Sequence, residues 1–190
     1  FGMDGVKHGY AVVIQDTRGR WASEGENLPF IGDGWWAGHQ DGVDTLEWIS
    51  KQVWCNGKIG TWGASALGIT QLGMAGAGTN LLSAQHITVG TSDFYPYLVF
   101  PGGVFKKAMV EDWLKATKHQ ENAQDLWVGH AKRDTYWNQY DLNTRWGKVN
   151  APAVHLGGWY DIFGQGTIDS FVGYQTKGGK GARGKQVLIM

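Results

Sequence analysis

The sequence has little cysteine, no excess of charge and no long apolar stretch. A single cysteine, Cys55, excludes an internal disulfide bond. No run of about 18 apolar residues occurs, so we expect no membrane span. Because 17 Lys and Arg balance 17 Asp and Glu, we expect no nucleic-acid partner, which would require a basic surface. His, Cys and carboxylate residues show no metal spacing, and we expect neither a metal nor a cofactor.

Glycine and tryptophan, in contrast, are abundant. Hydrophobic residues make up 42% of the 190 residues and charged residues 18%, which is typical of a globular domain. The 30 glycines predict tight turns and close backbone approaches. The 11 tryptophans indicate large apolar surfaces, either around a pocket or cap or in an ordinary packed core. The G-x-G-x-x-G match at residues 179–184 precedes an expected strand, so we reject it as a dinucleotide site.

Strand-like and helix-like segments alternate along the chain. We expect strands at residues 9–15, 58–62, 84–89, 153–157 and 186–190, helices at 41–53, 66–75 and 165–174, and a long loop at 19–38. This alternation predicts an α/β fold, with a mostly parallel sheet and helices on both faces. Residues 93–148 interrupt it with aromatic residues and helical patches at 105–117 and 122–136. We therefore predict a core in two parts, 1–92 and 149–190, and a mainly helical cap insertion, 93–148.

Residues 60–68 join an expected strand to an expected helix and place Ser65 at the junction. A nucleophile elbow needs this context, with small neighbours because the strand and the helix pass close together. The backbone N–H of the following residue can then bind a developing oxyanion. The glycine expected two residues after the serine comes one residue late, at Gly68, with Leu67 in its place. The alternative is a serine that caps a helix N-terminus.

Asp161 follows the expected strand 153–157, where the acid of a Ser–Asp–His triad would lie. The alternative is that Asp161 caps the next helix. No histidine follows Asp161, since all six lie upstream of it. Either the base lies beyond Met190, which we favour because the chain stops in a strand-like segment, or the protein is an inactive hydrolase fold. We thus expect an internal piece of an enzyme, incomplete at both ends.

Several of these segments together resemble a known family. They are residues 9–19 (GYAVVIQDTRG), 23–25 (SEG), 44–49 (DTLEWI), 54–60 (WCNGKIG), the elbow and 158–161 (GWYD). In this order they are similar to the X-Pro dipeptidyl-peptidase / cocaine esterase family (CocE/NonD, peptidase S15-like) of α/β-hydrolases. The resemblance covers residues 9–89 and 152–190, and in the insertion it is confined to residues 101–103.

The resemblance implies an α/β-hydrolase core with Ser65 as the nucleophile and Asp161 as the triad acid. It implies that the backbone N–H of Ala66 is one oxyanion donor, although the family usually has Tyr at this position. It also implies a tyrosine hydroxyl upstream as the second donor, a histidine downstream of residue 190 in a Gly-Pro-Trp-x-His-like segment, and a C-terminal jelly-roll domain.

For the substrate pocket, the resemblance implies that Phe163 forms a wall of the acyl site, and we place the neighbouring Trp159 there as well. Asp93 could bind a substrate amine, as in the amino-ester hydrolase branch, or could cap a loop. We expect a serine hydrolase of a small ester, amide or X-Pro peptide, without a cofactor, and leave homo-oligomerisation of the longer protein open. The competing hypothesis is a non-catalytic scaffold that binds ligands or partners.

Overall fold

The computed structural model of the chain describes residues 2–27, 29–30, 34, 39–119 and 122–190. Its main elements, in chain order, are α1 (Gly2–Lys7), α2 (Asp41–Ser50), β1 (Ile59–Ala64), α3 (Ala66–Gly76), β2 (Leu82–Thr88), α4 (Lys107–Ala116), α5 (Asn122–Gly129), β3 (Ala153–Leu156), α6 (Gly164–Lys177) and β4 (Val187–Ile189). Short helical turns lie at Tyr95–Val99, Pro101–Gly103, Thr135–Tyr140, Leu142–Thr144 and Trp146–Lys148.

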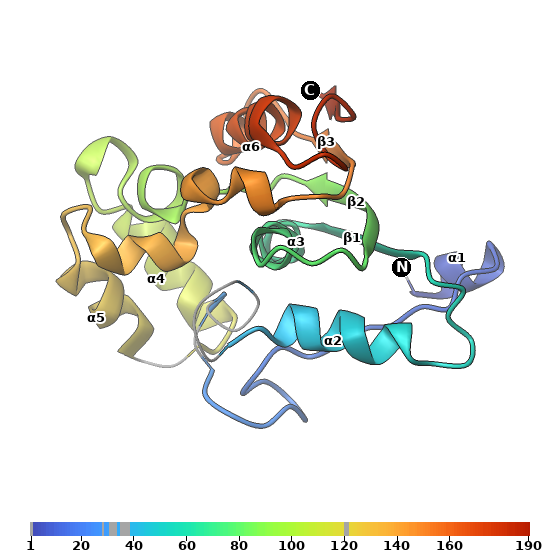
Figure 1. The fold of residues 1–190 in the computed structure, drawn as a ribbon. Coiled ribbons are helices and arrows are strands. Elements are labelled where there is room, and N and C mark those ends of the chain that lie inside the picture. The colour runs from blue at the N-terminus through green and yellow to red at the C-terminus, as the bar shows by residue number, and fades with distance from the viewer. Residues whose placement is uncertain (1, 28, 31–33, 35–38, 120–121) are drawn as a thin grey trace.

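The four strands form one parallel sheet in the order β1-β2-β3-β4 (Figure 1). Parallel neighbours require crossover connections, which α3, the insertion and α6 supply in turn. All four carboxyl ends therefore meet at one edge of the sheet. This arrangement confirms the expected α/β fold with a parallel sheet.

Helices α3 and α6 cover the same face of the sheet. Gln85 of β2 donates a hydrogen bond to the carbonyl of Gln71 in α3 and accepts one from the hydroxyl of Tyr174 in α6. On the opposite face, the side chains of Trp62 and Val187 remain about half exposed. We had expected helices on both faces, and among the described elements this second face carries no comparable cover.

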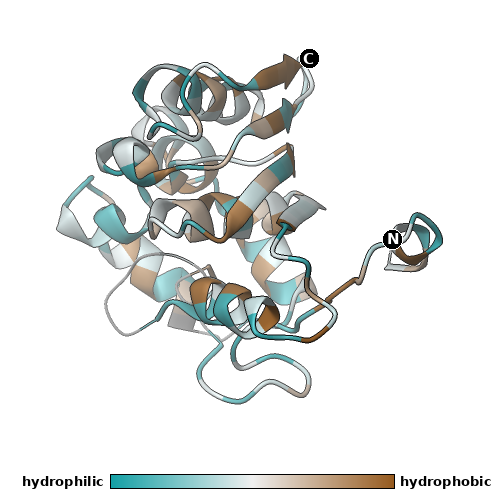
Figure 2. Ribbon diagram, turned by 45° about the vertical axis from the view of Figure 1, so that its right-hand side comes forward, coloured by the Kyte–Doolittle hydropathy of each residue, from teal (hydrophilic) through white to brown (hydrophobic). Residues whose placement is uncertain are grey.

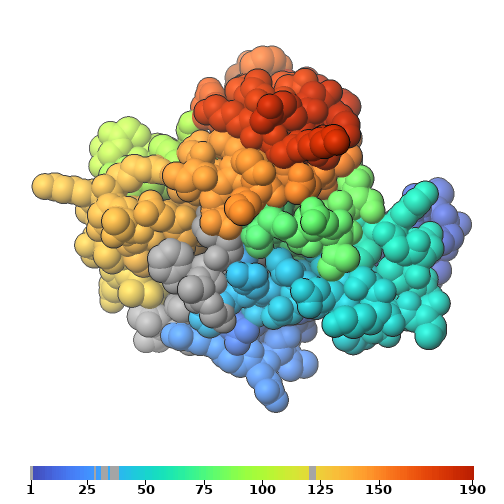
Figure 3. Space-filling view, viewed as in Figure 1, coloured from blue at the N-terminus to red at the C-terminus, as the bar shows by residue number. Residues whose placement is uncertain are grey.

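Apolar side chains gather in two clusters. The first joins the sheet to α2, α3 and α6, with Leu46, Leu72 and Ile87 each 1% exposed. The second is rich in aromatic rings and lies mainly within residues 94–140, with Trp127 and Trp137 almost fully buried. Figure 3 shows the insertion (light green through yellow to orange) beside the C-terminal elements (red). The division into core and insertion stays a prediction.

The strand expected at residues 9–15 is wrong. Residues 10–16 run as an extended segment outside the sheet, with Tyr10 and Ile14 more than two-thirds exposed. Figure 2 colours the segment that follows α1 as hydrophobic. A cavity of about 1040 Å³ separates it from β1. An apolar pattern predicts a strand only if a neighbouring strand is available for hydrogen bonding, and none of the described strands lies beside this segment.

The other expected elements are confirmed with shifted ends. The helix predicted at 122–136 ends at Gly129, and residues 135–140 form a separate 3₁₀ turn that the side chain of Asp134 caps. Part of the predicted loop 19–38 lies outside the described residues. Helix α1 has no counterpart in the sequence prediction. Over the described ranges, none of the helices has the length and apolarity needed to cross a membrane.

Candidate active site

Ser65 occupies a strained turn between β1 and α3. Its backbone has φ 56° and ψ −120°, a region that residues other than glycine rarely adopt. Such a conformation costs about 1–3 kcal/mol and persists where the surrounding structure enforces it. The backbone N–H of Ser65 is held by the carbonyl of Thr88 in β2, at 3.0 Å. The side chain is exposed and makes no capping hydrogen bond to the helix, contrary to the helix-cap alternative.

The glycines around the elbow allow this turn. A Cβ atom at Gly63 would lie 2.4 Å from the Cβ atom of Leu67, and one at Gly68 would lie 2.9 Å from the carbonyl oxygen of Thr88. Both distances are shorter than carbon atoms tolerate. Leu67, which replaces the glycine of the usual pattern, is 62% exposed, and the absence of a side chain at Gly63 leaves room for its Cβ atom. Position 68 therefore requires a glycine because α3 passes close to β2 there.

Ala66 begins α3 directly after the turn. The N–H groups of the first helical turn have no carbonyl partner within their own helix. They also carry the partial positive charge of the helix dipole. The backbone N–H of Ala66 is therefore a suitable donor to a negatively charged oxygen formed next to Ser65. This property depends on the backbone and not on the alanine side chain.

Asp161 lies in the connection between β3 and α6. One of its carboxylate oxygens, Oδ1, accepts a hydrogen bond from the backbone N–H of Phe163, at 2.8 Å. Helix α6 begins at Gly164, and its N-cap position is Phe163, which makes no side-chain cap. Asp161 thus shapes the turn before the helix and does not occupy the cap position. The side chain is half-buried, which leaves it within reach of solvent.

Ser65 and Asp161 share the carboxyl edge of the sheet. Ser65 follows β1 directly, Asp161 follows β3 by five residues, and β2 lies between the two strands. Because neighbouring strands are about 4.8 Å apart, the ends of β1 and β3 are separated by about 10 Å. The topology therefore places both expected catalytic residues at the same edge of the sheet.

The two aromatic candidates differ in burial. Phe163 is 5% exposed and packs in the aromatic cluster of the insertion. Trp159 is 74% exposed and does not line the cavity of about 1040 Å³. The cavity of about 1040 Å³ extends to the elbow, where Ala66, Leu67 and Trp62 contribute to its wall.

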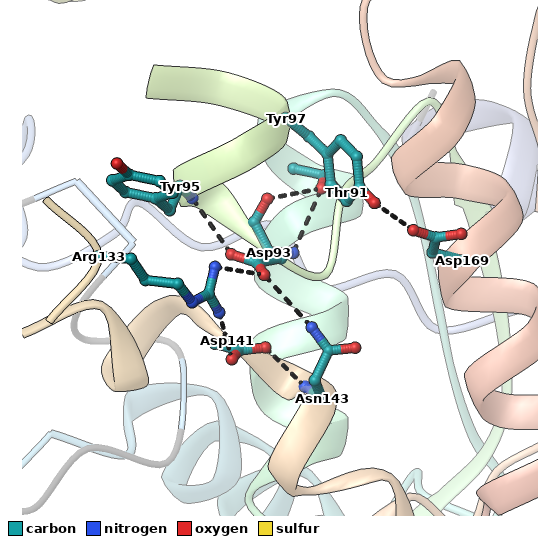
Figure 4. A network of polar contacts seen from close by, with 8 residues as sticks. All are labelled: Thr91, Asp93, Tyr95, Tyr97, Arg133, Asp141, Asn143 and Asp169. Carbon is teal, nitrogen blue, oxygen red and sulfur yellow. Dashed lines mark hydrogen bonds and ion pairs between the residues drawn. The ribbon is translucent and has the colours of Figure 1, made fainter. Parts of the chain in front are cut away.

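Asp93 is buried within a polar network at the start of the insertion (Figure 4). Arg133 donates from Nη1 to Asp93 at 2.8 Å and from Nη2 to Asp141 at 2.5 Å. Asn143 donates from its side-chain amide to Asp93 at 3.3 Å, and its backbone N–H donates to Asp141 at 2.8 Å. The backbone N–H of Tyr95 donates to the other oxygen of Asp93, at 3.2 Å.

The electrostatics of this network are unbalanced, because two buried carboxylates share one guanidinium. Burial and, second to it, the charge of Asp141 raise the pKa of Asp93 to about 6, although Arg133 and the backbone N–H of Tyr95 act in the opposite direction. In this structure Asp93 therefore has a cationic partner from the chain itself. A substrate amine would have to replace or join Arg133 there.

Of the histidines, His155 is buried and His119 is half-buried. His155 in β3 is fully buried against Phe171 and Tyr174, and burial lowers its pKa to about 4. His119 stacks on Trp113, and burial together with the charge of Arg20 lowers its pKa to about 4. Both are therefore neutral near pH 7.

Sequence reasoning missed Arg133 and Asp141. Each is a charged residue in a segment that also has Lys132, Asp134 and Lys148, so composition alone suggests a solvated surface. Arg133 pairs with Asp93, which lies 40 residues upstream (133 − 93), and an isolated antiparallel bridge places Asp141 beside Asp93. Within the part of the chain that the structure describes, no three His, Cys, Asp or Glu side chains gather as metal ligands would.

Known proteins similar to this chain are hydrolases. Cocaine esterase from Rhodococcus sp. (strain MB1 Bresler) is 31% identical over 90% of this chain, which spans 37% of that protein's length. A CocE/NonD family hydrolase from Staphylococcus aureus superposes with a TM-score of 0.71 at 24% identity, covering 82% of this chain and 29% of the other. An alpha-amino acid ester hydrolase superposes with a TM-score of 0.65 at 20% identity, covering 90% of this chain and 35% of the other.

The sequence profile described as X-Pro dipeptidyl-peptidase (S15 family) matches residues 3–126 and 107–189, which together include nearly the whole chain. The structural likenesses above show a common fold, and the cocaine esterase match extends over most of the same residues. On this evidence the chain belongs to the S15 family of X-Pro dipeptidyl-peptidases.

Proposed function

We propose that the protein is a serine hydrolase that cleaves an ester or amide bond through an acyl-enzyme on Ser65. The observation that carries the proposal is the backbone of Ser65, which is held at φ 56° between a parallel strand and a helix. This strain exposes the hydroxyl at the sheet edge instead of using it to cap the helix. The esterase names among the relatives support the reaction class.

In the proposed reaction, Ser65 Oγ attacks the carbonyl carbon while a histidine base takes its proton. Asp161 orients that histidine and stabilises its charged form. The backbone N–H of Ala66 stabilises the oxyanion that forms on the carbonyl oxygen. The protonated histidine then donates to the leaving group. In the second half of the reaction, the histidine takes a proton from water, the water oxygen attacks the acyl carbonyl carbon, and the histidine returns the proton to Ser65 Oγ as the bond between Oγ and the acyl carbon breaks. The family resemblance supports a base downstream of β4.

For the substrate, we propose a small ester, amide or X-Pro peptide, with the acyl part near Phe163. Phe163 is fixed by the aromatic cluster, and it follows the proposed acid by two residues. Trp159 is exposed beside the same turn and could cover a bound substrate from the solvent side. Asp93 would contribute to amine recognition only indirectly, because its carboxylate is already paired with Arg133, which also pairs with Asp141.

A second candidate is a non-catalytic scaffold that binds a ligand. It would need no histidine in the triad order, and within these 190 residues all six histidines precede Asp161. In that case the strain at Ser65 would have no catalytic use, and the serine would react no faster than an ordinary surface hydroxyl.

A fluorophosphonate probe distinguishes the two candidates. We expect it to label Ser65 in the longest natural polypeptide that carries this sequence, and Ser65→Ala to abolish the labelling. Thr70→Ala, which removes another hydroxyl from α3, is the matched control and should leave it unchanged. Absence of labelling under conditions that label a control esterase would support the scaffold. On the 190-residue chain alone we expect little turnover of a p-nitrophenyl ester, because losing a triad member removes most of the rate.

A further inference from the structure

Residues 90–93, which we call the wedge segment, lie between the two helices that carry the proposed site. A Cβ atom at Gly68 in α3 would come within 3.5 Å of the Cα atom of Gly90. A Cβ atom at Gly166 in α6 would come within 2.5 Å of the hydroxyl of Thr91. The side chain of Thr167 in α6 also donates a hydrogen bond to the carbonyl of Gly90, at 3.2 Å. The wedge segment therefore contacts the first turns of α3 and α6 with no spare space.

Arg133 holds the far end of the wedge segment. Its guanidinium contacts Asp93, the last residue of the segment, and Asp141, which lies near the end of the insertion. The backbone N–H of Leu142 donates to the carbonyl of Ser92, at 2.9 Å. Figure 4 shows the guanidinium next to both carboxylates, with Asp93 and Asp141 contributed by different parts of the chain.

The geometry requires a guanidinium. Asp93 and Asp141 are 4% and 6% exposed, so each charge is largely removed from water. Two like charges at this depth repel one another, and only a cation that touches both compensates them. The planar fork of arginine donates to two carboxylates at once, whereas the ammonium of lysine is a compact point charge on a flexible stem. Without Arg133, the two carboxylates would push the wedge segment and the end of the insertion apart.

We propose that Arg133 is a positioning residue for the reaction at Ser65. By joining Asp93 to Asp141, it keeps the wedge segment between the helix that follows Ser65 and the helix that follows Asp161. The inference rests on the function proposed above. It assigns Arg133 no contact with the substrate, since its effect passes through Asp93 and Thr91 to the start of α6.

The test compares Arg133→Gln and Arg133→Lys with Arg18→Gln, in the longest natural polypeptide that carries this sequence. Arg18 is a matched control because it also forms a two-point contact with a carboxylate, that of Asp41, away from the wedge segment. The readouts are the rate of fluorophosphonate labelling at Ser65 between pH 5 and pH 8, and hydrogen exchange in residues 88–93 and the first turn of α6.

We expect Arg133→Gln to slow labelling at pH 8 on the order of 10- to 100-fold, the effect of a displacement of about 1 Å in an active site. The loss should shrink toward pH 5, because Asp93 then takes up a proton and no longer repels Asp141. Arg133→Lys should give a smaller loss, and its retained charge makes it the variant to interpret if Arg133→Gln does not fold. Exchange should rise in the wedge segment and stay unchanged in β1.

Equal labelling rates and pH profiles for Arg133→Gln, Arg133→Lys and Arg18→Gln would overturn the positioning role while leaving Ser65 as the nucleophile. A uniform loss at all pH values, with raised exchange throughout the sheet, would also overturn it, because Arg133 would then support folding in general. Failure of the unaltered protein to be labelled would overturn the proposed function itself, and the role of Arg133 with it.

Discussion

Substituting Gly63 by alanine tests the packing of the elbow directly. Gly63 does not adopt a positive φ angle, so an alanine is compatible with its backbone. The new Cβ atom, however, would lie 2.4 Å from the Cβ atom of Leu67 and 3.4 Å from the carbonyl carbon and oxygen of the same residue. A Cβ atom is fixed to the backbone and cannot rotate away. The strand and the helix must therefore separate, and the turn that holds Ser65 must open.

The magnitude follows from two opposing effects. Overpacking of this kind costs about 1–3 kcal/mol. Replacing glycine by alanine within a strand recovers about 0.5–1 kcal/mol of backbone entropy. From the difference between the two ranges, we expect Gly63→Ala to lower the free energy of unfolding by up to about 2.5 kcal/mol. Urea denaturation followed by circular dichroism measures this on the 190-residue chain, and fluorophosphonate labelling of Ser65 measures the effect on the turn in the longer polypeptide.

A double-mutant cycle identifies the contact. Leu67→Gly removes the clashing Cβ atom, and Leu67→Ala keeps it while removing the rest of the exposed side chain. Gly63→Ala should therefore be nearly neutral in the Leu67→Gly background and fully destabilising in the Leu67→Ala background. Leu67→Gly itself costs about 1 kcal/mol in helix propensity, which the cycle subtracts. If Gly63→Ala costs the same in both backgrounds, the close approach of strand and helix is not the reason that position 63 requires a glycine.

Three further substitutions test the core. Because burial lowers the pKa of His155 to about 4 from an ordinary value of about 6.5, the folded state loses stability as the pH falls from about 6.5 toward 4. The free energy of unfolding of His155→Leu, measured by urea titration relative to the unaltered protein, should therefore increase by about 2 kcal/mol between pH 7 and pH 5. If this difference between the two proteins is the same at both pH values, the burial argument is wrong. Gly173→Ala should lower the free energy of unfolding by about 1–3 kcal/mol in thermal unfolding, because its Cβ atom would lie 2.4 Å from the ring of Trp146. Gly147→Ala is the control and should cost less, because the space around Gly147 is open. Leu46→Ala, at a site 1% exposed, should cost about 2–5 kcal/mol, and a cost below about 1 kcal/mol would show that α2 does not pack on the sheet.

The predicted strand at 9–15 shows where sequence patterns mislead. Val12, Val13 and Ile14 form a β-branched run typical of a buried parallel strand. Whether such a run enters a sheet depends on a free hydrogen-bonding partner at strand distance. Here the nearest strand, β1, is separated from it by a cavity. Local residue preferences contain no information about that separation.

The proposed acid and nucleophile were predictable for a different reason. Each follows a strand in the sequence, and parallel strands bring their carboxyl ends to one edge regardless of the residues between them. Arg133 was not predictable, because nothing near it in the sequence distinguishes a buried ion-pair partner from a solvated surface arginine. Its role depends on which carboxylates it contacts. The bridge between Asp93 and Asp141, near the two ends of the insertion, places both carboxylates next to it.

The sequence alone determined the α/β class, the positions of β1 to β4 and the candidate roles of Ser65 and Asp161, because apolar periodicity and glycine placement act over a few residues. Tertiary structure alone decided three things: that residues 10–16 stay outside the sheet, that Ser65 makes no helix cap, and that Asp93 is paired with Arg133. Each of these depends on atoms far apart in the chain, whose contact energies arise only when the sheet and the insertion are assembled.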